Sequence, residues 1–180
     1  IEGTTRDLSK SQWFSPPELA KRVVEWADLE AHGDASRPMR VLEPSAGNGA
    51  FVRPLVAVGA IVHAFEIDER YRADLKRETG DFGWVHMHDF LQCEPSRDIT
   101  FDLCVMNPPY EDGQDVAFIL HALKFAPRIV GIFTDRIMFG VERKEGLWSK
   151  VRPTRIAFQS RRPFKGAQTD YIVAELVKRV

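Results

Sequence analysis

The tetrapeptide Asn107-Pro108-Pro109-Tyr110 directly follows the apolar run Phe101-Asp102-Leu103-Cys104-Val105-Met106. The run predicts a buried strand. Two successive prolines end it, because proline cannot donate to a sheet ladder. A residue before proline is pushed out of the helical region, so we expect Asn107 to be extended. The turn then presents an amide, the Pro108 carbonyl and the Tyr110 ring, which together suit a planar group carrying an NH2. The alternative is a proline-rich turn without chemistry.

Around this strand the sequence alternates between expected strands and helices. We expect strands over residues 40–43, 61–65, 84–87, 101–106, 129–134, 154–158 and 171–176, and helices over 16–28, 51–58, 69–79, 115–125 and 142–150. Ser15 is expected to cap the first helix. The alternation favours an α/β fold, with helices on both faces of a parallel sheet and an antiparallel hairpin at its end.

Polar residues follow four of the expected strands, namely Glu43, Glu66, Asp89 and Asn107. Ligands of such sheets bind at the carboxyl ends of the strands, so we expect these side chains around one site. The turn 43–49 contains glycines that would let the backbone approach a ligand. It is not the dinucleotide fingerprint, because Val52 occupies the place of the third small residue. Taken alone, each acid could equally be solvated.

Six stretches together resemble the S-adenosylmethionine-dependent amino-methyltransferases, most closely the DNA adenine N6-methyltransferases of phages and restriction–modification systems. They are Phe14-Ser15-Pro16-Pro17, the turn from Glu43 to Phe51, Glu66-Ile67-Asp68, Asp89-Phe90-Leu91, Asn107 to Tyr110, and Arg162-Pro163-Phe164-Lys165-Gly166. The resemblance implies a class I, Rossmann-like fold with seven mostly parallel strands and an antiparallel last strand.

The same resemblance implies roles for individual residues. The catalytic residues would be Asn107, Pro108, Pro109 and Tyr110. S-adenosylmethionine would be bound by Phe14, Ser15, Pro16, Glu43, Pro44, Ser45, Ala46, Gly47, Gly49, Glu66, Ile67, Asp89, Phe90 and Asn107. Tyr110 and Phe164 would stack on the extruded base, although Phe164 could instead be a core residue.

The expected activity is methyl transfer from S-adenosylmethionine to the N6 amine of adenine in DNA. RNA adenine and a protein glutamine amide are alternative substrates, and a noncatalytic cofactor-binding subunit is an alternative outside the enzymes. Sequence-specific relatives carry a target-recognition segment that is not evident here. Sequence specificity could therefore be relaxed, supplied by a specificity subunit or another partner, or lost with a trimmed end.

At 180 residues the chain is expected to form one catalytic domain over 13–180, preceded by a flexible arm over 1–12. The formal net charge is −1, but residues 121–180 carry +8 and residues 1–120 carry −9. A basic final third fits a polyanion, with Arg161, Arg162 and Lys165 expected on the nucleic-acid backbone. An ordinary solvated face is the alternative.

Cys93 and Cys104 are the only cysteines, and Cys104 falls within an apolar strand, so we expect a reduced, cytoplasmic protein. The resemblance implies the cytoplasm of a bacterium, or that of the host for a phage-encoded protein. The sequence contains no apolar run of membrane-spanning length, so no membrane partner is expected. His86 and His88 share a strand face without a third ligand at suitable spacing, and no metal is expected.

Overall fold

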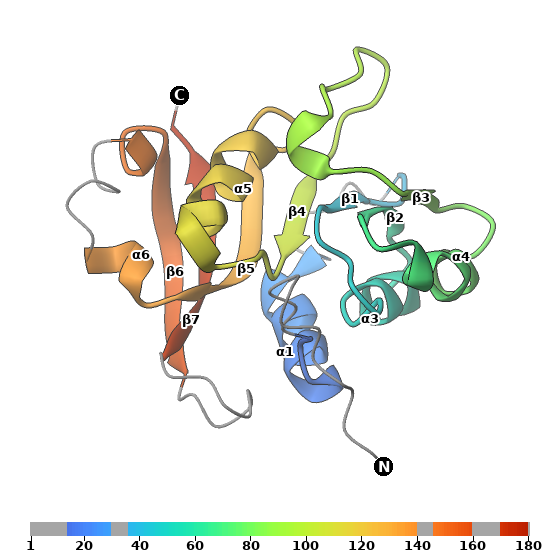
Figure 1. Ribbon diagram of the computed structural model, residues 1–180, viewed down its shortest axis with the longest axis horizontal. Coiled ribbons are helices and arrows are strands. Elements are labelled where there is room, and N and C mark those ends of the chain that lie inside the picture. Colours follow the sequence, from blue (N-terminus) through green and yellow to red (C-terminus); the bar gives the residue numbers. More distant parts are fainter. Residues whose placement is uncertain (1–13, 30–35, 140–145, 160–169, 180) are drawn as a thin grey trace.

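The computed structural model of the chain describes residues 14–29, 36–139, 146–159 and 170–179 (Figure 1). Its strands are β1 Arg40–Glu43, β2 Ile61–Phe65, β3 Trp84–His86, β4 Leu103–Met106, β5 Arg128–Thr134, β6 Val151–Gln159 and β7 Tyr171–Lys178. Its α-helices are α1 Pro17–Ala27, α3 Val52–Ala57, α4 Arg72–Thr79, α5 Gln114–Ala122 and α6 Arg136–Phe139. Three short 3-10 turns are η2 Glu69–Tyr71, η3 Phe90–Gln92 and η4 Glu111–Gly113.

The strands form one sheet in the order β3-β2-β1-β4-β5-β7-β6. Pairs from β3 to β5 are parallel, and β7 is antiparallel to both β5 and β6. In Figure 1 the sheet runs from β6 and β7 on one side to β3 on the other. The predicted seven-stranded sheet with a reversed last strand is therefore confirmed.

Alternating side chains along the central strands build a core on each face of the sheet. In β4, Leu103 and Val105 join the core covered by α1, α3 and α4. Cys104 and Met106 join the core covered by α5 and α6. This alternation follows from the two-residue period of a strand, and it confirms helices on both faces. None of the helices in the described ranges has the length and apolar character that a membrane crossing needs.

Four local predictions were wrong. Pro16, not Ser15, is the N-cap of α1, and no side chain caps that helix end. The single helix expected over 69–79 is divided into η2 and α4, and α6 was not predicted. Strand β6 begins at Val151, because an edge strand accommodates Pro153 with a register shift beside it.

Other predictions lie outside the described residues. These are the arm over 1–12, the first part of the helix expected over 142–150, and the connection that contains Arg161, Arg162, Phe164 and Lys165.

The C-terminal end of α1 is held to the sheet by a buried charge cluster. Arg128 Nε and Arg155 Nε each lie 2.6 Å from a different carboxylate oxygen of Glu175. Arg128 Nη2 donates to the carbonyl of Ala27, and Arg155 Nη2 donates to that of Trp26 at 2.6 Å. These carbonyls belong to the last turn of α1, where carbonyl groups have no hydrogen-bond partner within the helix. Glu175 therefore fixes both arginines that anchor α1.

We expect Glu175→Gln to lower the free energy of unfolding by about 3–5 kcal/mol, because it leaves two arginines without their shared buried carboxylate. Urea denaturation would measure the loss. The matched control is Asp74→Asn, which breaks an exposed pair with Arg77 and should change stability by no more than about 0.5 kcal/mol. Equal effects of the two substitutions would contradict the anchoring role.

Candidate functional site

A cavity of about 450 Å³ lies at the carboxyl ends of the central strands. This volume is within the range of small-molecule sites, and the position is the one at which open α/β sheets bind ligands. The predicted site residues that line it are Phe14, Ser15, Glu43, Pro44, Ser45, Ala46, Gly47, Glu66, Ile67, Asp89, Phe90, Asn107, Pro108 and Pro109. The fold therefore gathers stretches that are up to 95 positions apart in the sequence.

Seven further residues line the cavity without having been predicted, namely Asn48, Ala50, Phe51, His88, Leu91, Gln114 and Phe118. Five of them lie within two positions of predicted residues, so widening each motif by two positions would have found them. Gln114 and Phe118 lie on α5. Their sequence signal was only the amphipathic pattern of a helix, which does not indicate a cavity.

Three predicted site residues do not line this cavity, namely Pro16, Gly49 and Tyr110. Pro16 is the N-cap of α1. Gly49 has a φ of +78°, and a Cβ there would lie 3.3 Å from Leu75 Cδ2. That glycine permits close packing of the turn on α4. The predicted base-stacking residue Phe164 lies outside the described part of the chain.

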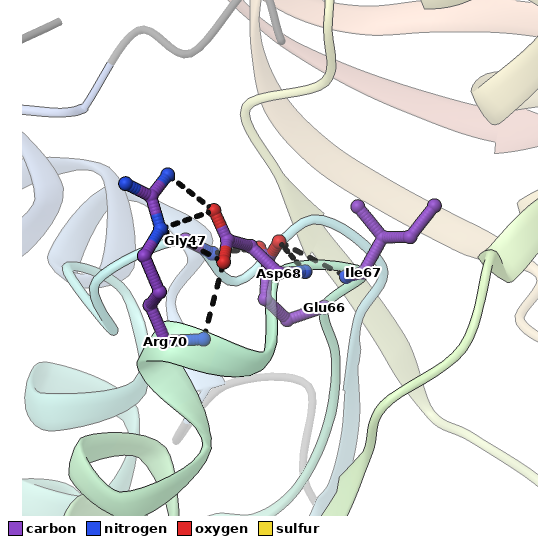
Figure 2. A network of polar contacts seen from close by, with 5 residues as sticks. All are labelled: Gly47, Glu66, Ile67, Asp68 and Arg70. Carbon is purple, nitrogen blue, oxygen red and sulfur yellow. Dashed lines mark hydrogen bonds and ion pairs between the residues drawn. The ribbon is translucent and has the colours of Figure 1, made fainter. Parts of the chain in front are cut away.

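The carboxylate of Glu66 joins the end of β2 to the glycine-containing turn after β1 (Figure 2). One of its oxygens accepts from the Gly47 N–H at 2.7 Å, and the other accepts from the N–H groups of Ile67 and Asp68 at 2.9 and 2.8 Å. A carboxylate can accept about four hydrogen bonds, and these three backbone groups leave one site open, on the oxygen that accepts from Gly47. Glu66 can therefore shape the turn and still accept a ligand hydroxyl, and its predicted contact with a ribose stays a prediction.

Asp68 continues this network toward the surface. Its carboxylate accepts from Arg70 Nε and Nη2 and from the Arg70 backbone N–H. Figure 2 shows the Ile67 side chain pointing away from these polar groups. Ile67 lines the cavity although it is 65% exposed, which leaves an apolar surface for a ligand to cover.

Gly47 is required by both its backbone and its neighbour. Its φ is +53°, and a Cβ would lie 3.1 Å from the Phe14 ring. Phe14 also meets Tyr71 edge-on, with the ring centroids 5.7 Å apart. The segment before α1 thus packs directly on the glycine-containing turn.

Glu43 is a buried acid on the cavity wall. It is only 1% exposed, and its Oε2 has no hydrogen-bond partner among the described residues. Burial, followed by the nearby Glu66 carboxylate, raises the pKa of Glu43 well above its usual value, against the opposing effect of Arg53. Because an unpaired buried acid is unfavourable, this wall favours a ligand that brings a cationic or hydrogen-donating group.

Asp89 and Phe90 lie at the end of β3. One Asp89 carboxylate oxygen accepts from the Leu91 N–H at 3.0 Å, which begins η3. Phe90 is almost fully buried and meets Phe65 edge-on, so it is at once a core residue and part of the cavity wall. Their predicted contacts with a cofactor adenine stay predictions.

The side chain of Asn107 is held at both ends of its amide. Its Nδ2 donates to Ser15 Oγ at 3.0 Å, and its Oδ1 accepts from the Tyr110 hydroxyl. Its backbone carbonyl accepts from Ser45 Oγ at 3.2 Å. The predicted acceptance of a target NH2 by Oδ1 stays a prediction.

The Tyr110 hydroxyl points into the protein. It lies 3.1 Å from the Ile132 carbonyl oxygen as well as against Asn107. Burial, with Asp115 and Tyr171 nearby, raises the pKa of Tyr110, so the hydroxyl keeps its proton. The predicted stacking of its ring on a base stays a prediction.

No group of three or more potential metal ligands occurs in the part of the chain that the structure describes. His86, one of the two histidines considered as metal ligands, lies beside another histidine of the sheet. Its Nε2 is 3.4 Å from His63 Nδ1. Burial, with His86 and Arg40 nearby, lowers the pKa of His63 to about 4. Burial and then His88 lower the pKa of His86.

Arg155 does not contribute to a surface for a polyanion. Besides its bonds to Glu175 and Trp26, its guanidinium lies 4.4 Å from the centre of the Trp26 ring. It therefore belongs to the anchor of α1. The predicted backbone contacts Arg161, Arg162 and Lys165 stay predictions, because they lie outside the described ranges.

No protein-family model matches the chain. Among curated proteins, the ribosomal RNA small subunit methyltransferase A of Thermotoga neapolitana is 34% identical over 101 residues. The match spans 54% of this chain and 35% of that protein, so the chain corresponds to about a third of the relative's length.

Solved structures match much more of the chain. A candidate RNA methyltransferase of Pyrococcus horikoshii has a TM-score of 0.77 at 16% identity, with coverage of 98% of this chain and 91% of that one. The chain has the class I methyltransferase fold.

Two further proteins whose solved structures have this fold are named for different substrates. A dimethyladenosine transferase of Plasmodium falciparum gives a TM-score of 0.66 at 18% identity, covering 93% of this chain and 64% of that one. The magnesium protoporphyrin IX methyltransferase of Synechocystis, solved with S-adenosylmethionine, gives 0.69 at 15% identity, covering 99% and 87%. The shared fold therefore does not select a substrate.

We expect Glu66→Gln to lower the free energy of unfolding by about 1.5–3 kcal/mol, because at least one hydrogen bond from a backbone N–H to a charged acceptor is lost. Urea denaturation measures this change. Glu69→Gln is the control, since its exposed carboxylate pairs with Arg72 outside the cavity and should change stability by no more than about 0.5 kcal/mol. An unchanged stability of the Glu66 variant would remove the carboxylate from its structural role.

Proposed function

We propose that the chain is an S-adenosylmethionine-dependent methyltransferase that acts on the N6 amine of adenine in RNA. The observation that carries the proposal is the meeting of two groups of residues at one cavity. The Asn107-Pro108-Pro109 turn lines it from the end of β4, and Glu43, Gly47 and Glu66 line it from the ends of β1 and β2. One ligand could thus meet both sets at once.

The cavity has the polar groups that this cofactor requires. Glu43 offers to a cationic group a buried carboxyl oxygen that has no partner among the described residues, and Glu66 offers its remaining lone pair to a ribose hydroxyl. Ile67 and Phe90 give apolar surface for an adenine ring. When bound, S-adenosylmethionine supplies a methyl group activated by attachment to a sulfonium sulfur.

The residues of the turn would prepare the target amine for attack. The amine is a weak nucleophile, because its lone pair is delocalised into the base. Acceptance of its two N–H groups by Asn107 Oδ1 and the Pro108 carbonyl directs that lone pair toward the methyl group. The nitrogen forms the new N–C bond while the S–C bond breaks, its electron pair stays on sulfur, and an amine proton leaves to water.

The choice of RNA over DNA rests on the comparisons rather than on the turn. The curated relative and the Pyrococcus horikoshii protein are named as RNA methyltransferases, and the Plasmodium falciparum protein is named as a dimethyladenosine transferase. These names support adenine in RNA as the substrate. The resemblance of Asn107 to Tyr110 to DNA adenine enzymes supports adenine alone. The RNA alternative is thus better supported than the DNA substrate that the sequence led us to expect.

Methyl transfer to three substrates tests the proposal. The chain is incubated with methyl-labelled S-adenosylmethionine and, separately, with unmodified small-subunit ribosomal RNA, duplex DNA, or protein. Mass spectrometry of the digested products identifies the modified group. We expect label in N6-methylated adenosine of RNA. Label confined to DNA or to a glutamine amide would replace the proposed substrate, and binding of the cofactor without transfer would favour a noncatalytic subunit.

We expect Asn107→Ala to reduce kcat by about a hundredfold or more, because the target amine loses an acceptor that acts at the reacting nitrogen. Cofactor binding should remain measurable by calorimetry. Glu111→Gln is the control, since this exposed neighbour does not line the cavity. Near-normal turnover in Asn107→Ala would exclude the turn from catalysis.

A further inference from the structure

Ser15 contacts the turn that contains Asn107, Pro108 and Pro109. This contact was not predicted from the sequence. The residue is 5% exposed, and it does not cap α1. Its Oγ instead accepts from Asn107 Nδ2 at 3.0 Å, across 92 positions of sequence. The hydroxyl that was expected to begin a helix is therefore directed at the amide expected to hold the substrate.

The amide is useful only in one orientation. Rotation about the Cβ–Cγ bond of Asn107 exchanges the carbonyl oxygen for an NH2 of nearly the same shape. The NH2 cannot accept from a target amine. The amide donates to Ser15 Oγ at one end and accepts from the Tyr110 hydroxyl at the other, so this rotation would require both hydroxyl groups to exchange donor and acceptor roles. Orientation of this kind contributes strongly to rates, and a misplacement of 1 Å can cost about a hundredfold.

The position of Ser15 is itself fixed by its surroundings. The preceding Phe14 ring packs on Gly47, and the following Pro16 and Pro17 restrict the backbone. At the far end of α1, Arg128 and Arg155 hold the last carbonyls. Ser15 is thus carried by a segment that is anchored at both ends of its helix.

We infer that Ser15 is a positioning residue, whose hydroxyl holds the Asn107 amide in the orientation that accepts the target amine. The inference rests on the proposed methyl transfer and deepens it. It separates Ser15 from the cofactor-binding residues among which the resemblance placed it. Loss of a cofactor contact would raise the cofactor Kd, whereas loss of positioning lowers kcat.

The test compares Ser15→Thr with Ser15→Val, which have the same shape and differ in the hydroxyl. We expect the Val variant to lose about 10- to 100-fold in kcat relative to the Thr variant, with cofactor Kd values within about twofold of each other by calorimetry. Equal kcat values would overturn the inference. A rise in the Kd of the Val variant that accounts for its whole loss would overturn it as well, in favour of a cofactor contact.

A second measurement does not depend on turnover. The side-chain NH2 of Asn107 gives a pair of NMR signals, assigned by their absence in Asn107→Ala. In Ser15→Ala we expect these signals to shift and their exchange with solvent to accelerate, whereas Ser15→Thr keeps them near the wild-type positions. Unchanged signals in Ser15→Ala would overturn the inference. If the wild type transfers no methyl group, the proposed function fails, and these signals alone decide whether Ser15 holds the amide.

Discussion

The hydrogen bond from the Gly47 N–H to Glu66 is the interaction on which the site depends. It joins the turn after β1 to the end of β2, and the other oxygen of the same carboxylate fixes the Ile67–Asp68 turn. Parallel strands bring these ends to one edge of the sheet, but they do not fix the loops that follow them. A nearly buried carboxylate with three backbone donors does so, because hydrogen bonds to a charged acceptor are stronger than those between neutral groups. The cavity wall therefore has a defined shape before any ligand binds.

Two acids lie side by side in this wall, and their environments differ. Glu66 accepts from backbone N–H groups, whereas Glu43 is buried with an oxygen that has no partner in the described part of the chain, and burial raises the pKa of Glu43. A neighbouring anion adds to that rise. Glu66 is thus held by the protein, whereas Glu43 can still form a hydrogen bond with a ligand. Such a pair is typical of sites where a ligand completes the hydrogen bonding. Structural neighbours with the same sheet are named for unrelated substrates, so the loops around this wall must determine substrate specificity.

The N-terminal segment connects the two halves of the site. Phe14 packs on the glycine-containing turn, Ser15 binds the Asn107 amide, and the far end of α1 is tied to β5, β6 and β7 through Glu175. The glycine-containing turn and the Asn107-Pro108-Pro109 turn are therefore joined by one short segment. Displacement of α1 would therefore disturb both of these parts of the cavity wall.

The sequence by itself determined the sheet, its helical cover and the edge at which the site lies. Alternation of apolar runs with amphipathic segments is local, and residues at strand ends such as Glu43, Glu66 and Asn107 could be placed by counting. Only the tertiary structure decided which atoms meet. The bond of Ser15 to Asn107, the inward hydroxyl of Tyr110 and the pairing of Arg155 with Glu175 join residues from separate elements. Their partners depend on how those elements pack, and a helix-capping pattern or a basic charge count carries no information about that packing.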